Sequence, residues 1–320
     1  SAASDVYKRQ AKRMLSKPES RFVNAVMRKL PQLIQSEPTD DSVKTLSRIM
    51  SHPTWMIKRW KKIFGKPKLK QLLEWNQRVP NVYAFCPVPE IMIPDGWKPT
   101  PWPSFFEVKK ANWSLTKELL AEWKAYIQDP SARLGVELLE GLKFESVLDL
   151  CASPGGKSVQ LFHRISLSGG LLVSVDVPGA RFDRLVKNLE PFKFQNVTAL
   201  QVAGDVLQLG PGDLPQTTFD LVYLDVPCSN TGVLQRRPDV KWRQTKETLK
   251  GLVGLQEALL KKASEFVKEK GYLVYSTCSI DPDENQGVVD QFLGTNLSLI
   301  HISEPTRRTP ISYAVFCVKK

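Results

Sequence analysis

The sequence lacks any long uninterrupted apolar run, and its first residues contain no apolar core of the kind that signal peptides carry. Both absences argue against a membrane-spanning helix and a secretory leader, so we expect a soluble, cytoplasmic protein with no membrane partner. Cysteine and histidine are scarce, with five and three residues, and no Cys-x-x-Cys pair occurs. The sequence therefore offers no zinc-binding pattern, and we expect no metal and reduced thiols.

Two nucleotide-binding fingerprints are also missing, the G-x-G-x-x-G of dinucleotide folds and the P-loop G-x-x-x-x-G-K-[ST]. Acidic residues are in the minority, since 33 Asp and Glu stand against 45 Lys and Arg, and the net charge is +12. This surplus favours a polyanionic partner, although many basic proteins bind none. The hydrophobic share of 42% is too high for a disordered chain, so the 320 residues are expected to form one large or two modest domains.

The two ends of the chain are encoded by inverted copies of one DNA sequence. Asp5 to Gln10 can be encoded by GATGTGTATAAGAGACAG, and the reverse complement of that string translates as residues 297–302. Both copies resemble transposase-adapter sequence from sequencing libraries. We therefore expect 1–10 and 297–320 to be adapter-like and non-native, and the residues between them to be a fragment truncated at both ends.

The residues between these ends change character twice. Residues 11–78 are basic and place apolar residues at helical spacing, whereas 79–143 are rich in proline and tryptophan and predict a small mixed subdomain. From Phe144 onward strands and helices alternate, which is typical of an α/β fold with a parallel sheet. The predicted strands are 146–150, 171–175, 197–202, 219–224 and 271–275, and the predicted helices are 158–165, 181–189 and 247–268.

The predicted strands end in residues that suit a ligand site, because open α/β sheets bind ligands at the carboxyl ends of their strands. Gly155-Gly156 lets a ligand approach the backbone of the first loop. Asp176 follows about 20 residues later, where such folds place the acid that binds a ribose. It could instead cap the next helix, and Gly204-Asp205 could form a plain turn. A cationic sulfonium nucleoside suits this acidic pocket better than a pyrophosphate, since four acids lie in it: Asp149, Asp176, Asp205 and Asp225.

The stretch 219–242 combines an acid, a thiol and a basic aromatic segment. Its strand ends on Asp225, and the Pro-Cys-Ser-Asn sequence that follows places Asp225 and Cys228 in a strand-end loop. Read by itself, this stretch makes Cys228 the obvious nucleophile. The basic aromatic segment is expected either to contact nucleic acid or merely to shape the loop, and it consists of Arg236, Arg237, Lys241 and Trp242.

These residues resemble the RNA cytosine-5 methyltransferases of the Nop/Sun family. Five motifs carry the resemblance in the family's order: LDLCASPGGK, SVDVPGARFDRL, AGDVLQL, YLDVPCSNTGVLQRRPDVKW and LVYSTCSIDPDEN. Two upstream segments, FVNAVMRKL and SHPTWMIKRW, resemble the linker of the bacterial RsmB (Sun, Fmu) type, which acts on small-subunit ribosomal RNA. In that type a NusB-like helical domain precedes the catalytic part.

The resemblance implies a Rossmann-like S-adenosylmethionine-dependent methyltransferase core over 144–296, a small RNA-recognition subdomain over 79–143 and a truncated NusB-like helical remnant and linker over 11–78. It implies that Cys278 is the nucleophile that adds to C6 of cytosine, and that Cys228 assists product release. Asp225 would hydrogen-bond the pyrimidine. DNA cytosine methyltransferases use their Pro-Cys thiol instead, so Cys228 as nucleophile is the rival assignment.

The resemblance also implies the cofactor, S-adenosyl-L-methionine, and the partner, RNA, with ribosomal RNA expected first. The same chemistry on transfer RNA and a non-catalytic RNA-binding ribosome assembly factor are the alternatives, and we expect a monomer. After Asn296 the family's final strands are replaced by adapter-like residues, which leaves the antiparallel edge of the sheet without a predicted sequence. The expected cofactor-binding residues are Cys151, Ala152, Ser153, Pro154, Gly155, Gly156, Lys157, Asp176, Asp205 and Asp225.

Overall fold

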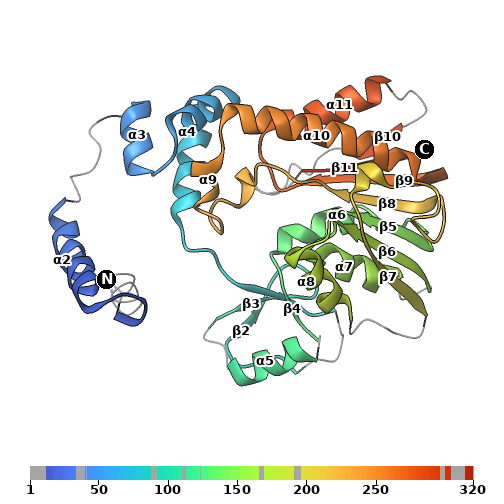
Figure 1. Ribbon diagram of the computed structural model, residues 1–320, viewed down its shortest axis with the longest axis horizontal. Coiled ribbons are helices and arrows are strands. Elements are labelled where there is room, and N and C mark those ends of the chain that lie inside the picture. Colours follow the sequence, from blue (N-terminus) through green and yellow to red (C-terminus); the bar gives the residue numbers. More distant parts are fainter. Residues whose placement is uncertain are drawn as a thin grey trace. The chain divides into compact units, whose positions relative to one another are not determined.

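The structure is a computed structural model that describes residues 12–33, 40, 42–87, 92–109, 113–122, 124–165, 169–190, 196–295, 300–303 and 314–319. It divides into two compact units, Ser1–Gly65 and Lys66–Lys320. The first unit is helical and contains α2 (Lys17–Leu33), α3 (Val43–Ile49) and the beginning of α4 (Thr54–Gln77) (Figure 1). Within the described residues, no helix is long and apolar enough to cross a membrane.

Helix α4 is interrupted at Gly65, where the division between the units falls. Gly65 has a φ of +73°, a left-handed conformation that glycine adopts without steric cost, and Pro67 follows it within the helix. Most of the described residues in the predicted helical region 11–78 are therefore helical, but the region extends across both units. Its likeness to a NusB-like domain stays a prediction.

The second unit begins with a small antiparallel sheet of strand order β2-β3-β1-β4. A small cluster of buried side chains that includes Trp97 and Leu119 fixes this sheet against helix α5. The residues predicted as a mixed subdomain, 79–143, contain this sheet and short helices, whereas their separation as a subdomain stays a prediction (Figure 1). Its elements are β1 (Tyr83–Phe85), β2 (Trp97–Pro99), β3 (Phe105–Val108), α5 (Trp113–Ala121), β4 (Tyr126–Ile127), η1 (Pro130–Arg133) and α6 (Leu134–Glu137).

The larger sheet has seven strands in the order β10-β11-β9-β8-β5-β6-β7. Strands β9, β8, β5, β6 and β7 pair in parallel, and the strand order reverses between β5 and β8, which is the switch point where such sheets bind ligands. The predicted α/β fold is confirmed, with β9 longer than expected. The strands are β5 (Ser146–Leu150), β6 (Gly170–Asp176), β7 (Val197–Ala203), β8 (Phe219–Asp225), β9 (Val267–Thr277), β10 (Ile300–Ser303) and β11 (Ala314–Lys319).

Helices cover both faces of this sheet because its strands are apolar on both sides. Leu148 and Val222 point to the face covered by α10 and α11, and their neighbours Val147 and Leu221 point to the face covered by α7 and α8 (Figure 1). Short helical turns lie in the connecting loops. The helices are α7 (Gly156–Ile165), α8 (Ala180–Leu189), α9 (Val240–Arg243), α10 (Lys246–Glu265) and α11 (Gln286–Thr295), with turns η3 (Val206–Gln208), η4 (Thr231–Val233) and η5 (Pro282–Glu284).

The antiparallel edge, for which the sequence offered no predicted strands, is present. Strand β11 pairs with β9 from Ala314 opposite Thr277 to Lys319 opposite Tyr272, and β10 pairs with β11. Phe316 and Cys317 are buried on opposite faces of the sheet. Phe316 and Cys317 of the adapter-like segment therefore bury their side chains on the two faces of the sheet beside β9.

Candidate active site

The parallel pairing of β8 with β9 builds the centre of the site. Asp225, the last residue of β8, lies opposite Ser276, and the Ser276 hydroxyl donates to the Asp225 carboxylate at 2.7 Å. The Val226 N–H donates to the Ser276 carbonyl at 3.0 Å, which extends the pairing by one residue. Because Cys228 and Cys278 follow within three residues of these positions, the register brings both cysteines to the same strand-end edge.

Cys228 and Cys278, the thiol pair, touch each other. Their Sγ atoms are 3.1 Å apart, and the Cys228 side chain is buried while Cys278 is partly exposed. The hydrogen bond with Cys278 and burial together raise the pKa of the Cys228 thiol well above its ordinary value. Cys228 is therefore held as a protonated thiol that can donate toward the Cys278 sulfur.

Asn230 joins the two loops that carry the thiol pair. The Cys278 thiol donates to its side-chain oxygen at 3.2 Å, and its side-chain nitrogen donates to the Cys228 carbonyl at 2.7 Å. Asn230 has a φ of +58°, a left-handed conformation that asparagine tolerates better than most residues. This backbone geometry turns the amide toward both cysteines.

Glu284, in η5, is a buried carboxylate behind the thiol pair. One of its oxygens accepts from the Ser229 N–H at 2.7 Å and from the Gln256 side chain at 3.0 Å. Its other oxygen accepts from the hydroxyls of Ser229 and Ser279. Since Ser229 and Ser279 directly follow the two cysteines, one carboxylate clamps both loops, and Gln256 ties that clamp to α10.

The first loop, residues 151–155 between β5 and α7, is fixed by β6 and α8. The Asp176 carboxylate accepts from the Ser153 N–H at 2.8 Å, and Arg181 donates to the Ser153 carbonyl at 2.6 Å. Gly155 has a φ of +102°, and a β-carbon there would lie 3.1 Å from a methyl group of Leu185 on α8. Glycine is needed at this position because the loop turns sharply and packs closely on α8.

Buried charges lie beneath this loop. The Lys157 ammonium forms an ion pair with the Asp225 carboxylate. Asp149 is fully buried and accepts from the Ser158 hydroxyl at 2.6 Å. Burial raises the pKa of Asp149 to about 7 against the opposing effect of that hydrogen bond. Its second oxygen is buried and has no hydrogen-bond partner in the part of the chain that the structure describes.

Most of the predicted site residues line one or both of two neighbouring cavities. The first, of about 340 Å³, contains the thiol pair, and its lining also includes Cys151, Ser153, Asp176, Asp205, Asp225, Asn230 and Arg237. The second, of about 270 Å³, shares Ser153 and Asp225 with the first, and its lining also includes Ala152, Pro154, Gly156, Lys157 and Asp149. Of the ten predicted cofactor residues, Gly155 alone lines neither cavity, since it packs against α8.

The structure does not bring the four predicted RNA contacts together. Arg237 lines the cavity of the thiol pair, and Trp242 is 58% exposed. Arg236 instead donates to the Asp129 carboxylate and lines a different cavity. Lys241 is only 5% exposed, and burial lowers its pKa. Lys241 is therefore less exposed than a phosphate contact is expected to be, and its role in RNA binding stays a prediction.

Three site residues were not predicted from the sequence: Asn230, Gln256 and Glu284. Asn230 and Glu284 belong to the quoted motifs, but polar residues in a proline-containing loop look like solvated turn residues. Gln256 lies in a helix without any local signal. Among the described residues, no group of three or more His, Cys, Asp and Glu side chains is arranged to hold a metal ion.

Comparison with known proteins identifies the family. The family model described as "16S rRNA methyltransferase RsmB/F" matches residues 136–310, more than half of the chain. The chain belongs to this family. The prediction from the five motifs is thus confirmed.

Among curated members of the RsmB/F family, the ribosomal RNA small subunit methyltransferase B of Yersinia pseudotuberculosis is 29% identical over 297 residues, which are 88% of this chain. The same protein of Yersinia pestis matches with equal identity. The alignment spans 66% of the length of these relatives, so this chain corresponds to somewhat less than two thirds of them.

Solved structures share the fold. A methyltransferase homologue from Pyrococcus horikoshii has a TM-score of 0.70 and 22% identity, covering 88% of this chain and 99% of that one. The structure of NSun6 from Pyrococcus horikoshii with SFG has a TM-score of 0.67 and 16% identity, covering 84% of this chain and 98% of that one. These likenesses place the present sheet and its flanking helices in the Rossmann-like methyltransferase fold.

Proposed function

We propose that this chain transfers a methyl group from S-adenosylmethionine to C5 of a cytosine in small-subunit ribosomal RNA, through a covalent bond between Cys278 and C6 of the base. One observation carries the proposal. Two thiols from adjacent strand ends lie 3.1 Å apart in a cavity that also contains the strand-end acids Asp176, Asp205 and Asp225. A chain that only bound RNA would have no use for two touching reduced cysteines beside an acidic nucleoside pocket.

The residues present fit S-adenosylmethionine. The acids around the cavity suit a cationic sulfonium, and Asp176 follows the second strand of the sheet, where related folds bind a ribose. The unpartnered oxygen of Asp149 and the loop around Ser153 offer further polar contacts. When bound, the cofactor supplies an electrophilic methyl group to the cytosine.

Cys278 is assigned as the nucleophile because it is the partly exposed member of the thiol pair and lines the cavity. C5 of cytosine is a weak nucleophile, and addition of the Cys278 sulfur to C6 moves electron density to C5, which then takes the methyl group. The Asp225 carboxylate, held by Lys157 and Ser276, is placed to hydrogen-bond the base. Both partners fix its orientation before the base arrives.

Cys228 is assigned to product release. After methylation a base such as water takes the C5 proton, the electrons of the C5–H bond restore the C5–C6 double bond, and Cys278 leaves C6 as a thiolate. The raised pKa of Cys228 keeps it as a thiol, and its contact with Cys278 allows it to donate a hydrogen bond to that departing sulfur. The same raised pKa leaves little of Cys228 as the thiolate that attack on C6 requires.

A methyl-transfer assay tests the proposal. The chain is incubated with S-adenosylmethionine labelled in its methyl group and with transcripts of 16S ribosomal RNA or transfer RNA, and the RNA is digested to nucleosides. We expect labelled 5-methylcytidine from the ribosomal transcript and none from transfer RNA. Label in transfer RNA alone would favour the alternative substrate, and label in neither RNA, although the cofactor binds, would favour a non-catalytic RNA-binding factor.

A further inference from the structure

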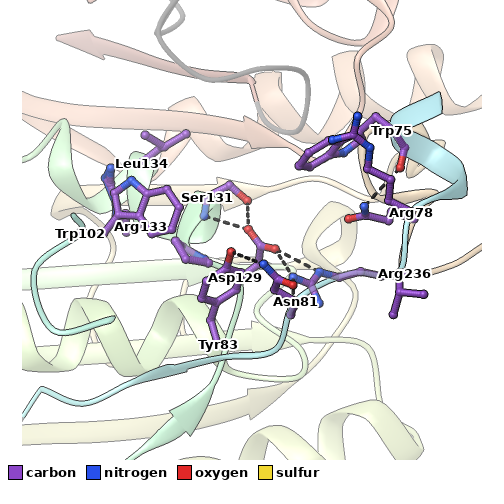
Figure 2. A pocket seen from close by; sticks show the side chains of 13 residues that line it. Trp75, Arg78, Asn81, Tyr83, Trp102, Asp129, Ser131, Arg133, Leu134 and Arg236 are labelled. Carbon is purple, nitrogen blue, oxygen red and sulfur yellow. Dashed lines mark hydrogen bonds and ion pairs between the residues drawn. The ribbon is translucent and has the colours of Figure 1, made fainter. Parts of the chain in front are cut away.

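A separate cavity of about 300 Å³ lies beside the active site, between the end of α4, the small sheet and the loop after β8. Its volume lies at the lower end of the range of about 300–1,000 Å³ that is usual for small-ligand pockets. Three aromatic and three basic side chains dominate its lining, which brings together segments far apart in the sequence (Figure 2). We call it the tryptophan–arginine pocket, and these six residues are Trp75, Arg78, Tyr83, Trp102, Arg133 and Arg236.

The centre of the pocket is an ion pair between Arg236 and Asp129. The Arg236 side chain donates to the Asp129 carboxylate at 3.0 Å and to the Asn81 carbonyl at 3.0 Å. Asp129 also accepts from the Ser131 N–H at 3.0 Å, which caps η1. These hydrogen bonds hold Arg236 and Asp129 in place, and the aromatic rings on either side of the ion pair remain available to contact a ligand.

Each tryptophan in the pocket stands beside an arginine. The Arg78 guanidinium lies 5.7 Å from the ring centre of Trp75, and that of Arg133 lies 5.9 Å from the ring centre of Trp102. Figure 2 shows these two groups on opposite sides of the pair formed by Asp129 and Arg236. Trp75 is 39% exposed, so its ring is accessible. Flat rings beside guanidinium groups suit a stacked base and its phosphate.

The pocket is connected to the active site through Asp129. This residue also lines the cavity that contains Lys157 and Asp225. Gln235, which donates to the Trp75 carbonyl at 3.2 Å, and Arg236 follow Cys228 in the same loop. A ligand in the tryptophan–arginine pocket therefore lies close to a cytosine held at the thiol pair.

We propose that the tryptophan–arginine pocket binds one unpaired nucleotide of the RNA substrate, near the target cytosine, with its base stacked on Trp75 and its phosphate on Arg78. The inference rests on the proposed function, since it takes RNA to be the substrate. Sequence-specific RNA recognition acts mainly on unpaired bases that stack on aromatic rings or guanidinium planes. A target base must be unstacked to reach the thiols, and a second base held nearby would keep the strand open.

Binding of short fluorescent single-stranded RNA, measured by anisotropy, tests the pocket without turnover. We expect Trp75→Ala to weaken binding about tenfold and Trp75→Phe, which keeps a flat ring, to stay near the wild-type affinity. Arg78→Ala should also weaken binding, whereas Arg184→Ala, an exposed arginine on α8 outside the pocket, should have a smaller effect. Affinity for duplex RNA of equal length should be unchanged by Trp75→Ala.

Abasic RNA locates the bound nucleotide. In the ribosomal transcript, single nucleotides near the methylated cytosine are replaced by abasic residues, and the KM for methylation is measured. One replacement should raise the KM of the wild-type protein about tenfold and leave that of Trp75→Ala unchanged. Equal losses in both proteins at every position, or wild-type RNA binding by folded Trp75→Ala and Arg78→Ala, would overturn the inference. If the wild-type protein methylates none of the RNAs although its RNA binding still depends on Trp75, the result would instead count against the proposed function.

Discussion

Replacing Glu284 should weaken the protein and disorganise the thiol pair while leaving cofactor binding intact. The carboxylate is fully buried and accepts hydrogen bonds from Ser229, Ser279 and Gln256. Glu284 does not line either of the two cavities assigned to cofactor and target base. Its effect on catalysis must therefore pass through the loops it holds.

The size of the effect follows from which donors lose their acceptor. In Glu284→Ala the hydroxyls of Ser229 and Ser279 still pair at 3.1 Å, and the Gln256 amide still donates to the Pro227 carbonyl at 3.0 Å. The Ser229 N–H has no such replacement. One orphaned donor, the lost charge-assisted bonds and the cavity together predict a loss of about 3–5 kcal/mol in the free energy of unfolding. Glu284→Gln keeps an oxygen for the two N–H donors and should cost about 1–2 kcal/mol.

Urea unfolding, calorimetry with a cofactor analogue and single-turnover methylation measure these effects separately. Glu284→Ala should slow methylation on the order of 10–100-fold, because small displacements of reacting groups cost this much, with the analogue's Kd unchanged. Asp283→Ala is the matched control, since it removes the neighbouring exposed carboxylate. Wild-type stability of Glu284→Ala, or loss of cofactor binding with a normal methylation step, would refute the clamp.

Three further predictions concern charge, redox state and the sheet edge. Burial raises the pKa of Asp149 to about 7 from an unfolded value near 3.9, so the contribution of its protonated form to stability is complete below about pH 4 and is lost as the pH rises toward 7. Over this range the free energy of unfolding should fall by up to about 4 kcal/mol in the wild-type protein, and Asp149→Asn should remove that fall. Urea unfolding at different pH values measures it, and an unchanged pH dependence in the variant would contradict the prediction. Hydrogen peroxide should join Cys228 and Cys278 as a disulfide, since the two thiols give up two protons and two electrons and the peroxide becomes two waters. Methylation should then fall and should return when dithiothreitol is added. Intact mass spectrometry that shows only oxygen addition would argue against the contact between the two thiols. Phe316→Ala should lower the free energy of unfolding by about 3–5 kcal/mol because the ring is fully buried, whereas an unchanged urea midpoint would show that β11 does not cover β9.

The sheet was predictable because its strands are short apolar runs that end at acids, glycines or cysteines. The predicted strand 146–150 coincides with β5, and 219–224 is one residue shorter than β8. The start of β9 was missed because the predicted helix 247–268 includes Val267 and Lys268, which are the first two residues of the strand. The antiparallel edge was missed because the residues of β10 and β11 resemble adapter sequence.

The proximity of Asp225, Cys228 and Cys278 was predictable because each lies at or just after a strand end that the sequence pattern indicates. It was not predictable where function depends on a partner far away in the chain. Arg236 reads as a phosphate contact, but it pairs with Asp129, which precedes it by 107 residues. Lys241 reads as a surface charge, but it is buried in α9.

The roles of the two thiols can be tested directly by trapping the protein–RNA adduct. Cys228→Ala and Cys278→Ala proteins are incubated with S-adenosylmethionine and 16S ribosomal RNA transcript, and the denatured mixtures are analysed by mass spectrometry after RNA digestion. Cys228→Ala should accumulate a methylated cytidine nucleotide bonded to Cys278, and Cys278→Ala should form no adduct. An adduct on Cys228 in the Cys278→Ala protein, with none in Cys228→Ala, would reverse the assignment of nucleophile and release catalyst.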